Sequence, residues 1–106
     1  MEDPTQIVVH KAIISVDDRS HPVTVPASPY FKVVAVGEQG RNDQVVMWYE
    51  RPWPTDDEIL TTHYYRVFGT GQPIPGGCYY IGTVNVPNSI LVWHLYEVPQ
   101  AVAQRA

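Results

Sequence analysis

The residues best placed to bind an anion lie together in one glycine- and proline-rich segment. Gly69-Thr70-Gly71 offers backbone N–H groups and a hydroxyl, the donors found in phosphate-binding loops, and Arg66 adds a positive charge nearby. The segment lacks the Gly-x-x-x-x-Gly-Lys-Ser/Thr spacing of such loops, and no predicted helix follows whose N-terminal dipole would assist. We favour a shaped hairpin end and keep a backbone nest for an anionic ligand as the alternative.

The histidines follow no metal-ligand spacing. Two of them, His63 and His94, could meet if their strands are neighbours, but two imidazoles without a third ligand make an incomplete zinc site. We therefore predict no metal and no cofactor, and expect partly buried structural histidines. His94 is the stronger functional candidate because it lies in the most distinctive part of the chain and an imidazole titrates near neutral pH. The other two are His10 and His21.

Nucleophilic catalysis has little support. Cys78 follows two glycines at a loop-to-strand junction, and no neighbour in the sequence would lower the pKa of its thiol. Carboxylates cluster only in Asp17-Asp18 and Asp56-Asp57-Glu58, which is typical of solvated turns. The serines lack the surroundings of a nucleophile elbow; they are Ser15, Ser20, Ser28 and Ser89. We expect no catalytic residue and no enzyme; a hydrolase using His94 with Cys78, or a histidine-bound metal, is the least favoured alternative.

Aromatic rings are more numerous than the core of so small a domain can hide. Tyr and Trp combine a rigid apolar body with a polar tip and are enriched at interfaces. The surplus predicts self-association, a stacking pocket for a planar ligand, or both. The rings are Trp48, Tyr49, Trp53, Tyr64, Tyr65, Tyr79, Tyr80, Trp93 and Tyr96. The predicted ligand-binding set is Arg66, Gly69, Thr70, Gly71, Gln72, Trp93, His94 and Tyr96.

Composition narrows the class of protein. The 106 residues carry 7 basic and 11 acidic side chains, a net charge of −4, which argues against nucleic-acid binding. A single cysteine cannot form an internal disulfide and suits a reducing compartment. No leader opens the chain, and no apolar run reaches the roughly 18 residues of a membrane span. We expect a single cytoplasmic domain over residues 1–106 that contacts neither nucleic acid nor membrane.

The elements that must position these residues read as strands. Short apolar segments, rich in β-branched and aromatic residues, alternate with turn-forming ones. Strands joined by short turns pair antiparallel, so we predict an all-β fold, a compact antiparallel sandwich or barrel of about seven strands. The predicted strands are Ile7–Val16, Val23–Val25, Phe31–Gly37, Gln44–Arg51, Thr61–Phe68, Cys78–Val86 and Ile90–Val98.

Helical signals are confined to one place. Thr55-Asp56-Asp57-Glu58 has a capping-box pattern, and because Thr61 and Thr62 soon follow we expect one helical turn at most. The ordered core is predicted to span about residues 6–98, with frayed ends at Met1–Thr5 and Pro99–Ala106.

The last predicted strand is apolar on both faces. His94 and Tyr96 share one face, whereas Trp93 and Leu95 share the other. Such a strand is either central in the fold or covered by a partner subunit. In the preceding strand, Gly82 leaves a gap that Trp93 or His94 could cover, although packing alone is the favoured explanation.

Three segments of the chain are distinctive: Phe68–Pro75, Tyr80–Thr83 and Leu91–Glu97. They resemble a family of small uncharacterised proteins that occur mainly in bacteriophages and prophages, and weaker matches upstream are Ile7–Lys11, Val25-Pro26 and Met47-Trp48. The family carries a domain of unknown function, so the resemblance implies origin and fold without an activity. Gln72 stands where the family usually has histidine. If that histidine acts chemically, this chain has lost it.

The resulting functional expectation is a non-enzymatic binding module encoded by a phage. One concrete form of it is sequestration of a host nucleotide immune signal, with a Tyr or Trp stacked on the base and Gly69–Gly71 and Arg66 on the phosphate. The alternative is a structural or protein-interaction accessory protein with no small-molecule ligand.

Overall fold

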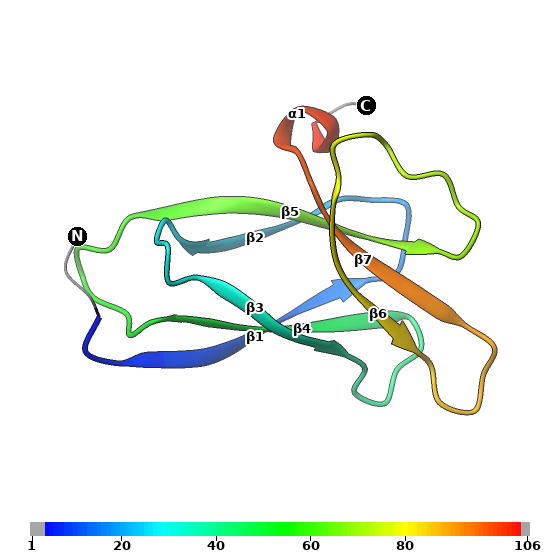
Figure 1. The fold of residues 1–106 in the computed structure, drawn as a ribbon, viewed down its shortest axis with the longest axis horizontal. Helices are drawn as coiled ribbons and strands as arrows, with labels where there is room; N and C mark the ends of the chain where they lie inside the picture. The colour runs from blue at the N-terminus through cyan, green and yellow to red at the C-terminus, as the bar shows by residue number, and fades with distance from the viewer. Residues whose placement is uncertain (1–3, 105–106) are drawn as a thin grey trace.

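Seven strands form two antiparallel sheets in the computed structural model, which describes residues 4–104 (Figure 1). One sheet has the order β1-β4-β3 and the other β2-β5-β7-β6. The strands are β1 (Ile7–Ser15), β2 (His21–Pro26), β3 (Lys32–Gly37), β4 (Gln44–Pro52), β5 (Leu60–Gly69), β6 (Tyr79–Asn85) and β7 (Val92–Val98). This confirms the predicted all-β class, and the two open sheets make the fold a sandwich.

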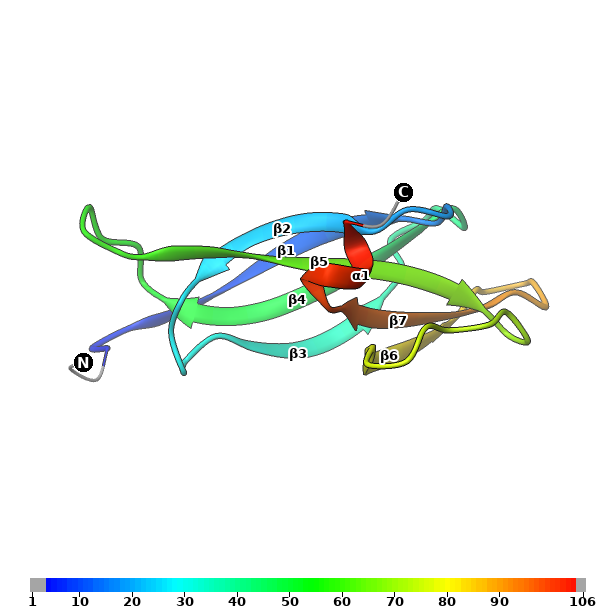
Figure 2. The same cartoon turned by 90° about the horizontal axis from the view of Figure 1, so that it is seen from above.

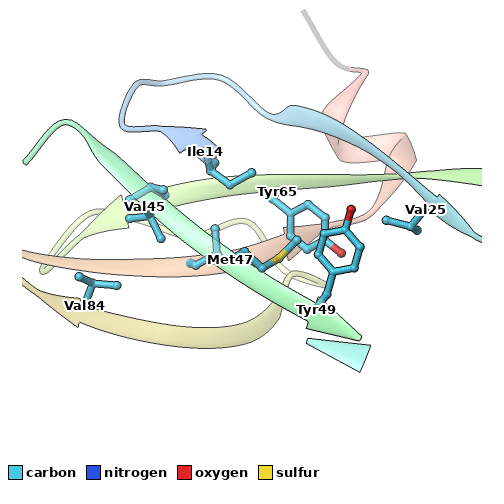
Figure 3. Close-up of a cluster of buried hydrophobic side chains, with 9 residues drawn as sticks. Ile14, Val25, Val45, Met47, Tyr49, Tyr65 and Val84 are labelled. Carbon is cyan, nitrogen blue, oxygen red and sulfur yellow. The ribbon is translucent and has the colours of Figure 1, made fainter. Parts of the chain in front are cut away.

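The core lies between the sheets (Figure 3). Strand alternation sends Met47 of β4 and Leu95 of β7 inward from opposite sheets, and neither side chain is exposed to solvent. The cluster consists of Ile14, Val25, Val45, Met47, Tyr49, Tyr65, Val67, Val84 and Leu95. Because β7 lies between β5 and β6, it is a central strand, one of the two positions its apolar faces predicted.

The two sheets approach each other most closely where β3 passes β6. A Cβ on Gly82 would lie 2.8 Å from Cγ2 of Val36, so only glycine allows this approach. The packing explanation for Gly82 is therefore correct. The residue over it comes from the opposite sheet rather than from an aromatic side chain of a neighbouring strand.

The segment between β5 and β6, residues 70–78, is a crossover loop. Both strands run antiparallel to β7, which lies between them, so the chain must return across β7 before entering β6 (Figure 1). Thr70 at the start of the loop is hydrogen-bonded to His94 near the start of β7, and Gly77 near the end of the loop packs against Pro99, which follows β7. The prediction that this segment is a hairpin end was therefore wrong, because β5 and β6 do not pair with each other.

The chain after β7 forms a short helix that the sequence did not predict. It is α1 (Gln100–Ala103), whose backbone N–H groups at Val102 and Ala103 donate to the Pro99 carbonyl, and it packs beside β5 (Figure 2). Residues 1–3 and 105–106 of the predicted frayed ends lie outside the described part of the chain.

The predicted capping box forms a single turn, which agrees with the expectation of one helical turn at most. Glu58 N–H donates to the Thr55 carbonyl, and the Glu58 carboxylate pairs with the buried Arg51 of β4. Within residues 4–104, no helix is long and apolar enough to cross a membrane.

Candidate functional site

The outer face of the four-stranded sheet gathers several of the predicted site residues. The register places Arg66 of β5 beside Tyr96 of β7, and one row further along it places Phe68 beside His94. Although this face points away from the core, Phe68 has no exposed surface, because the crossover loop and α1 cover the sheet there. The crossover loop and α1 therefore form a pocket together with the outer face of the sheet.

His94 is held at both ring nitrogens. Its Nε2 lies 2.9 Å from Thr70 Oγ1, and its Nδ1 lies 3.1 Å from Thr83 Oγ1. Thr83 Oγ1 in turn lies 2.7 Å from the Tyr80 hydroxyl, so polar groups from β6, β7 and the crossover loop form one hydrogen-bonded chain. This chain fastens the crossover loop to the sheet and leaves neither ring nitrogen of His94 without a partner.

Arg66 lies in a pocket beside the crossover loop. Its guanidinium stacks 4.6 Å from the centre of the Phe68 ring, and its nearest carboxylate is 3.8 Å away on Asp18, which is 95% exposed. The buried Nε of Arg66 has no hydrogen-bond partner among residues 4–104. The pocket holds about 350 Å³ and is lined by Asp18, Arg19, Ser20, Arg66, Phe68, Pro75, Val98, Val102 and Ala103.

A second arginine, Arg41, lines a different hollow and already has a close carboxylate partner. A larger hollow of about 720 Å³ lies between loops 38–43 and 86–89. Its arginine, Arg41, is already bonded in bidentate fashion to Asp43 at 2.9 and 2.7 Å. A ligand there would have to displace that carboxylate, whereas Arg66 has only a distant and solvated partner.

The glycine turn closes on itself. Gly69 N–H donates to the Gln72 side chain at 3.0 Å, and Gln72 N–H donates back to the Gly69 carbonyl. Gly71 between them has a φ of 88°, which favours glycine. Because the Gly69 N–H donates inside the turn, it is not available to an anion. The segment therefore closes the loop and is poorly suited to bind an anion through its backbone. Gln72, at the position where the resemblance has histidine, supplies that closure.

Trp93 lies beside Gly69, on the opposite face of the sheet from Arg66 and His94. It belongs to the inner face of β7, where its indole N–H donates to the Asn42 carbonyl at 3.0 Å. His63 likewise lies on an inner face and contacts Glu97 at 3.3 Å, so it does not meet His94 on the outer face. No group of three metal-ligating side chains forms within the described residues.

Cys78 lies near Arg66 at the end of the crossover loop. Burial raises the pKa of its thiol, although the guanidinium of Arg66 acts in the opposite direction. The thiol therefore stays protonated at neutral pH, which disfavours it as a nucleophile.

Two groups of residues at this site were not predicted from the sequence. Simple alternation places Tyr80 and Thr83 on opposite faces of β6, but a bulge between Tyr80 and Gly82 brings both to the outer face. Arg19 and Val102 line the Arg66 pocket from segments distant in sequence. No local signal points to either group.

Comparison with known proteins gives a family and no activity. Residues 5–106 match a family described as domain of unknown function DUF7352. No curated protein and no solved structure matches the chain.

Proposed function

Because the chain belongs to this family of unknown function, we propose from its own geometry that it is a non-enzymatic binding module for a small anionic ligand of the nucleotide class. The ligand would occupy the pocket beside Arg66. The observation that carries the proposal is the half-buried Arg66 guanidinium, which lines a pocket of about 350 Å³ with only a distant, exposed carboxylate as its partner. A volume of that size falls in the range of about 300–1,000 Å³ typical of small-molecule sites.

The lining of the pocket supports a ligand with one charged and one apolar part. Arg66, Arg19 and Ser20 contribute donors for a phosphate, whereas Pro75 and Val102 contribute accessible apolar surface. Two arginines in one pocket form a local positive site in a chain of net charge −4. The phosphate would bind the arginines, and the planar part of the ligand would lie against the apolar wall.

Tyr96 and Trp93 have lesser parts in this proposal than the sequence suggested. The Tyr96 ring already packs edge-on against Phe68 and Tyr80, at centroid distances of 5.7 and 5.5 Å. Trp93 is engaged on the inner face. Tyr96 would support the pocket wall through Phe68 and would not stack directly on the ligand.

We further propose that the ligand is a host nucleotide immune signal, sequestered by a phage-encoded protein in the cytoplasm of the infected bacterium. The resemblance of the chain to phage and prophage proteins supports this origin. Sequestration requires tight binding and no chemistry. The protonated Cys78 and the doubly bonded His94 fit that requirement.

Thermal unfolding in the presence of ligands tests the proposal. Linear and cyclic nucleotides are compared with their unphosphorylated nucleosides. Ligand at about tenfold its Kd stabilises the native state by about 1.4 kcal/mol, which for this chain length raises Tm by about 5 °C or more. We expect nucleotides but not nucleosides to raise Tm, and Arg66→Gln to remove the effect.

Arg41→Gln is the matched control, because it removes an arginine from a distant exposed loop. The Arg41 variant should respond to nucleotides as the unmodified protein does. If no nucleotide raises Tm, or if Arg66→Gln responds as strongly as the unmodified protein, the proposed function is wrong.

The second candidate is a structural or protein-interaction role without a small ligand. The apolar side chains exposed on the outward side of β1, Ile7, Val9 and Ile13, favour it. A failure of all nucleotides to bind, together with self-association or partner binding that depends on these side chains, would select this role.

A further inference from the structure

Strand β1 is an edge strand with a long unpaired side. At the two ends of its ladder with β4, Val16 N–H donates to the Asp43 carbonyl and Trp53 N–H donates to the Gln6 carbonyl. Because hydrogen-bonded positions alternate along an antiparallel strand, the even-numbered residues of β1 direct their backbone N–H and C=O groups to β4. The odd-numbered residues direct theirs away from the sheet, and within residues 4–104 no hydrogen bond to these groups is found. They are Ile7, Val9, Lys11, Ile13 and Ser15.

The other sheet edges are protected. β3 and β6 lie against each other, with Val36 packed on Gly82. In β2, the bond from Ala27 N–H to the Ile59 carbonyl indicates that the even-numbered positions face outward, and two of the three are Pro22 and Pro26. Proline has no N–H, so it blunts an edge without costing a ladder bond. β1 contains no proline, and Lys11 is the one charged residue along it.

The side chains along the free edge of β1 are also unusual for a solvent-facing strand. Ile7, Val9 and Ile13 are 51, 53 and 51% exposed, and all three lie on the outward side of the sheet. An antiparallel sheet with one face in water normally carries polar residues there. Unpaired backbone groups and exposed β-branched side chains therefore coincide on one strand.

We propose that a second copy of the chain pairs with β1 in antiparallel orientation about a two-fold axis, so that two three-stranded sheets join into one of six strands. A strand paired with itself in this way is self-complementary, which a symmetric dimer requires. Backbone geometry demands that odd-numbered residues face odd-numbered ones. The register with His10 on the axis places Ile7 opposite Ile13 and Val9 opposite Lys11. The register centred on Lys11 would oppose two like charges and is disfavoured.

The oligomeric state in solution tests the proposal. Light scattering coupled to size exclusion should give the mass of a dimer for the unmodified protein. Val9→Pro removes an N–H from the free edge but no bond to β4, so it should give a monomer with an unchanged circular dichroism spectrum. Val9→Thr keeps the N–H and the β-branched shape and should remain a dimer. A monomeric unmodified protein, or a dimeric Val9→Pro, would overturn the proposal.

Cross-linking tests the register, even if Val9→Pro does not fold. In a Cys78→Ser background, His10→Cys places two thiols across the axis at a separation a disulfide can span. Oxidation should therefore yield a covalent dimer. Ser15→Cys, five residues along the same strand, should not cross-link. Efficient cross-linking at position 15, or none at position 10, would exclude this pairing.

Discussion

Tyr65 is a buried side chain whose surroundings change its pKa. Its ring is fully buried on the inner face of β5, and its hydroxyl has no hydrogen-bond partner among the described residues. Burial, assisted by the nearby charge of Glu97, raises the pKa of this tyrosine well above its usual value. The folded state therefore resists ionisation of Tyr65, whereas the unfolded chain ionises it near pH 10.

Stability should consequently fall as pH rises above about 10, because only the unfolded state releases this proton there. Tyr65→Phe should remove that part of the alkaline loss. At neutral pH it should cost little or stabilise by about 1 kcal/mol, since it removes an unpaired hydroxyl. Urea unfolding at mildly and strongly alkaline pH measures both effects. Tyr79→Phe, at a residue that is 72% exposed, is the control and should lose as much stability at alkaline pH as the unmodified protein. If Tyr65→Phe also loses as much stability as the unmodified protein, the ionisation of Tyr65 is not the cause of the loss.

At the scale of elements, the fold depends on how closely β3 and β6 approach. Gly82 leaves no room for a side chain, because a Cβ there would also lie 3.1 Å from the Cβ of Val36. This contact brings the two sheets together at one side of the sandwich. It also lies on the strand whose bulge orients Tyr80 and Thr83 toward His94.

Gly82→Ala should destabilise the protein by about 1–3 kcal/mol, the usual cost of overpacking a well-packed site. Val36→Ala creates the missing space, so the double variant should recover part of that loss, and the two changes should be non-additive. Gly76→Ala is a fitting control because its Cβ would meet no atom within 4 Å. Chemical denaturation of the unmodified protein, the two single variants and the double variant measures the coupling energy. Additive effects would show that the contact with Val36 does not cause the destabilisation by Gly82→Ala.

At the scale of the whole molecule, the ligand pocket and the dimer edge lie on different sheets. The Arg66 pocket belongs to the outer face of β2-β5-β7-β6, whereas β1 borders the other sheet. Ligand binding and self-association can therefore be tested separately, and failure of one proposal leaves the other standing.

If the native state is a dimer and the unfolded state is a monomer, Tm must rise with protein concentration, because dimerisation stabilises only the folded chain. We expect this rise for the unmodified protein and for Arg66→Gln. Val9→Pro should unfold at a Tm that is independent of concentration. Scanning calorimetry over a dilution series provides the measurement, and a constant Tm for the unmodified protein would argue against association.

The sequence alone determined the number and positions of the strands. Turn-forming residues and alternating β-branched and aromatic side chains act over a few residues, so each of the seven segments could be recognised by itself. Arg66, Thr70 and His94 could also be selected from their residue types and neighbourhood. α1 was missed because four residues carry too little periodicity to predict a helix.

Which strands pair, and which side chains share a face, became clear from the three-dimensional fold alone. β6 pairs with β7 rather than with its predecessor β5, which turns residues 70–78 from a hairpin end into a loop across the sheet. The bulge in β6 brings Tyr80 and Thr83 to one face, and Trp93 turns inward away from Arg66. These outcomes depend on burial and register between segments far apart in the chain, where local backbone preferences carry no information.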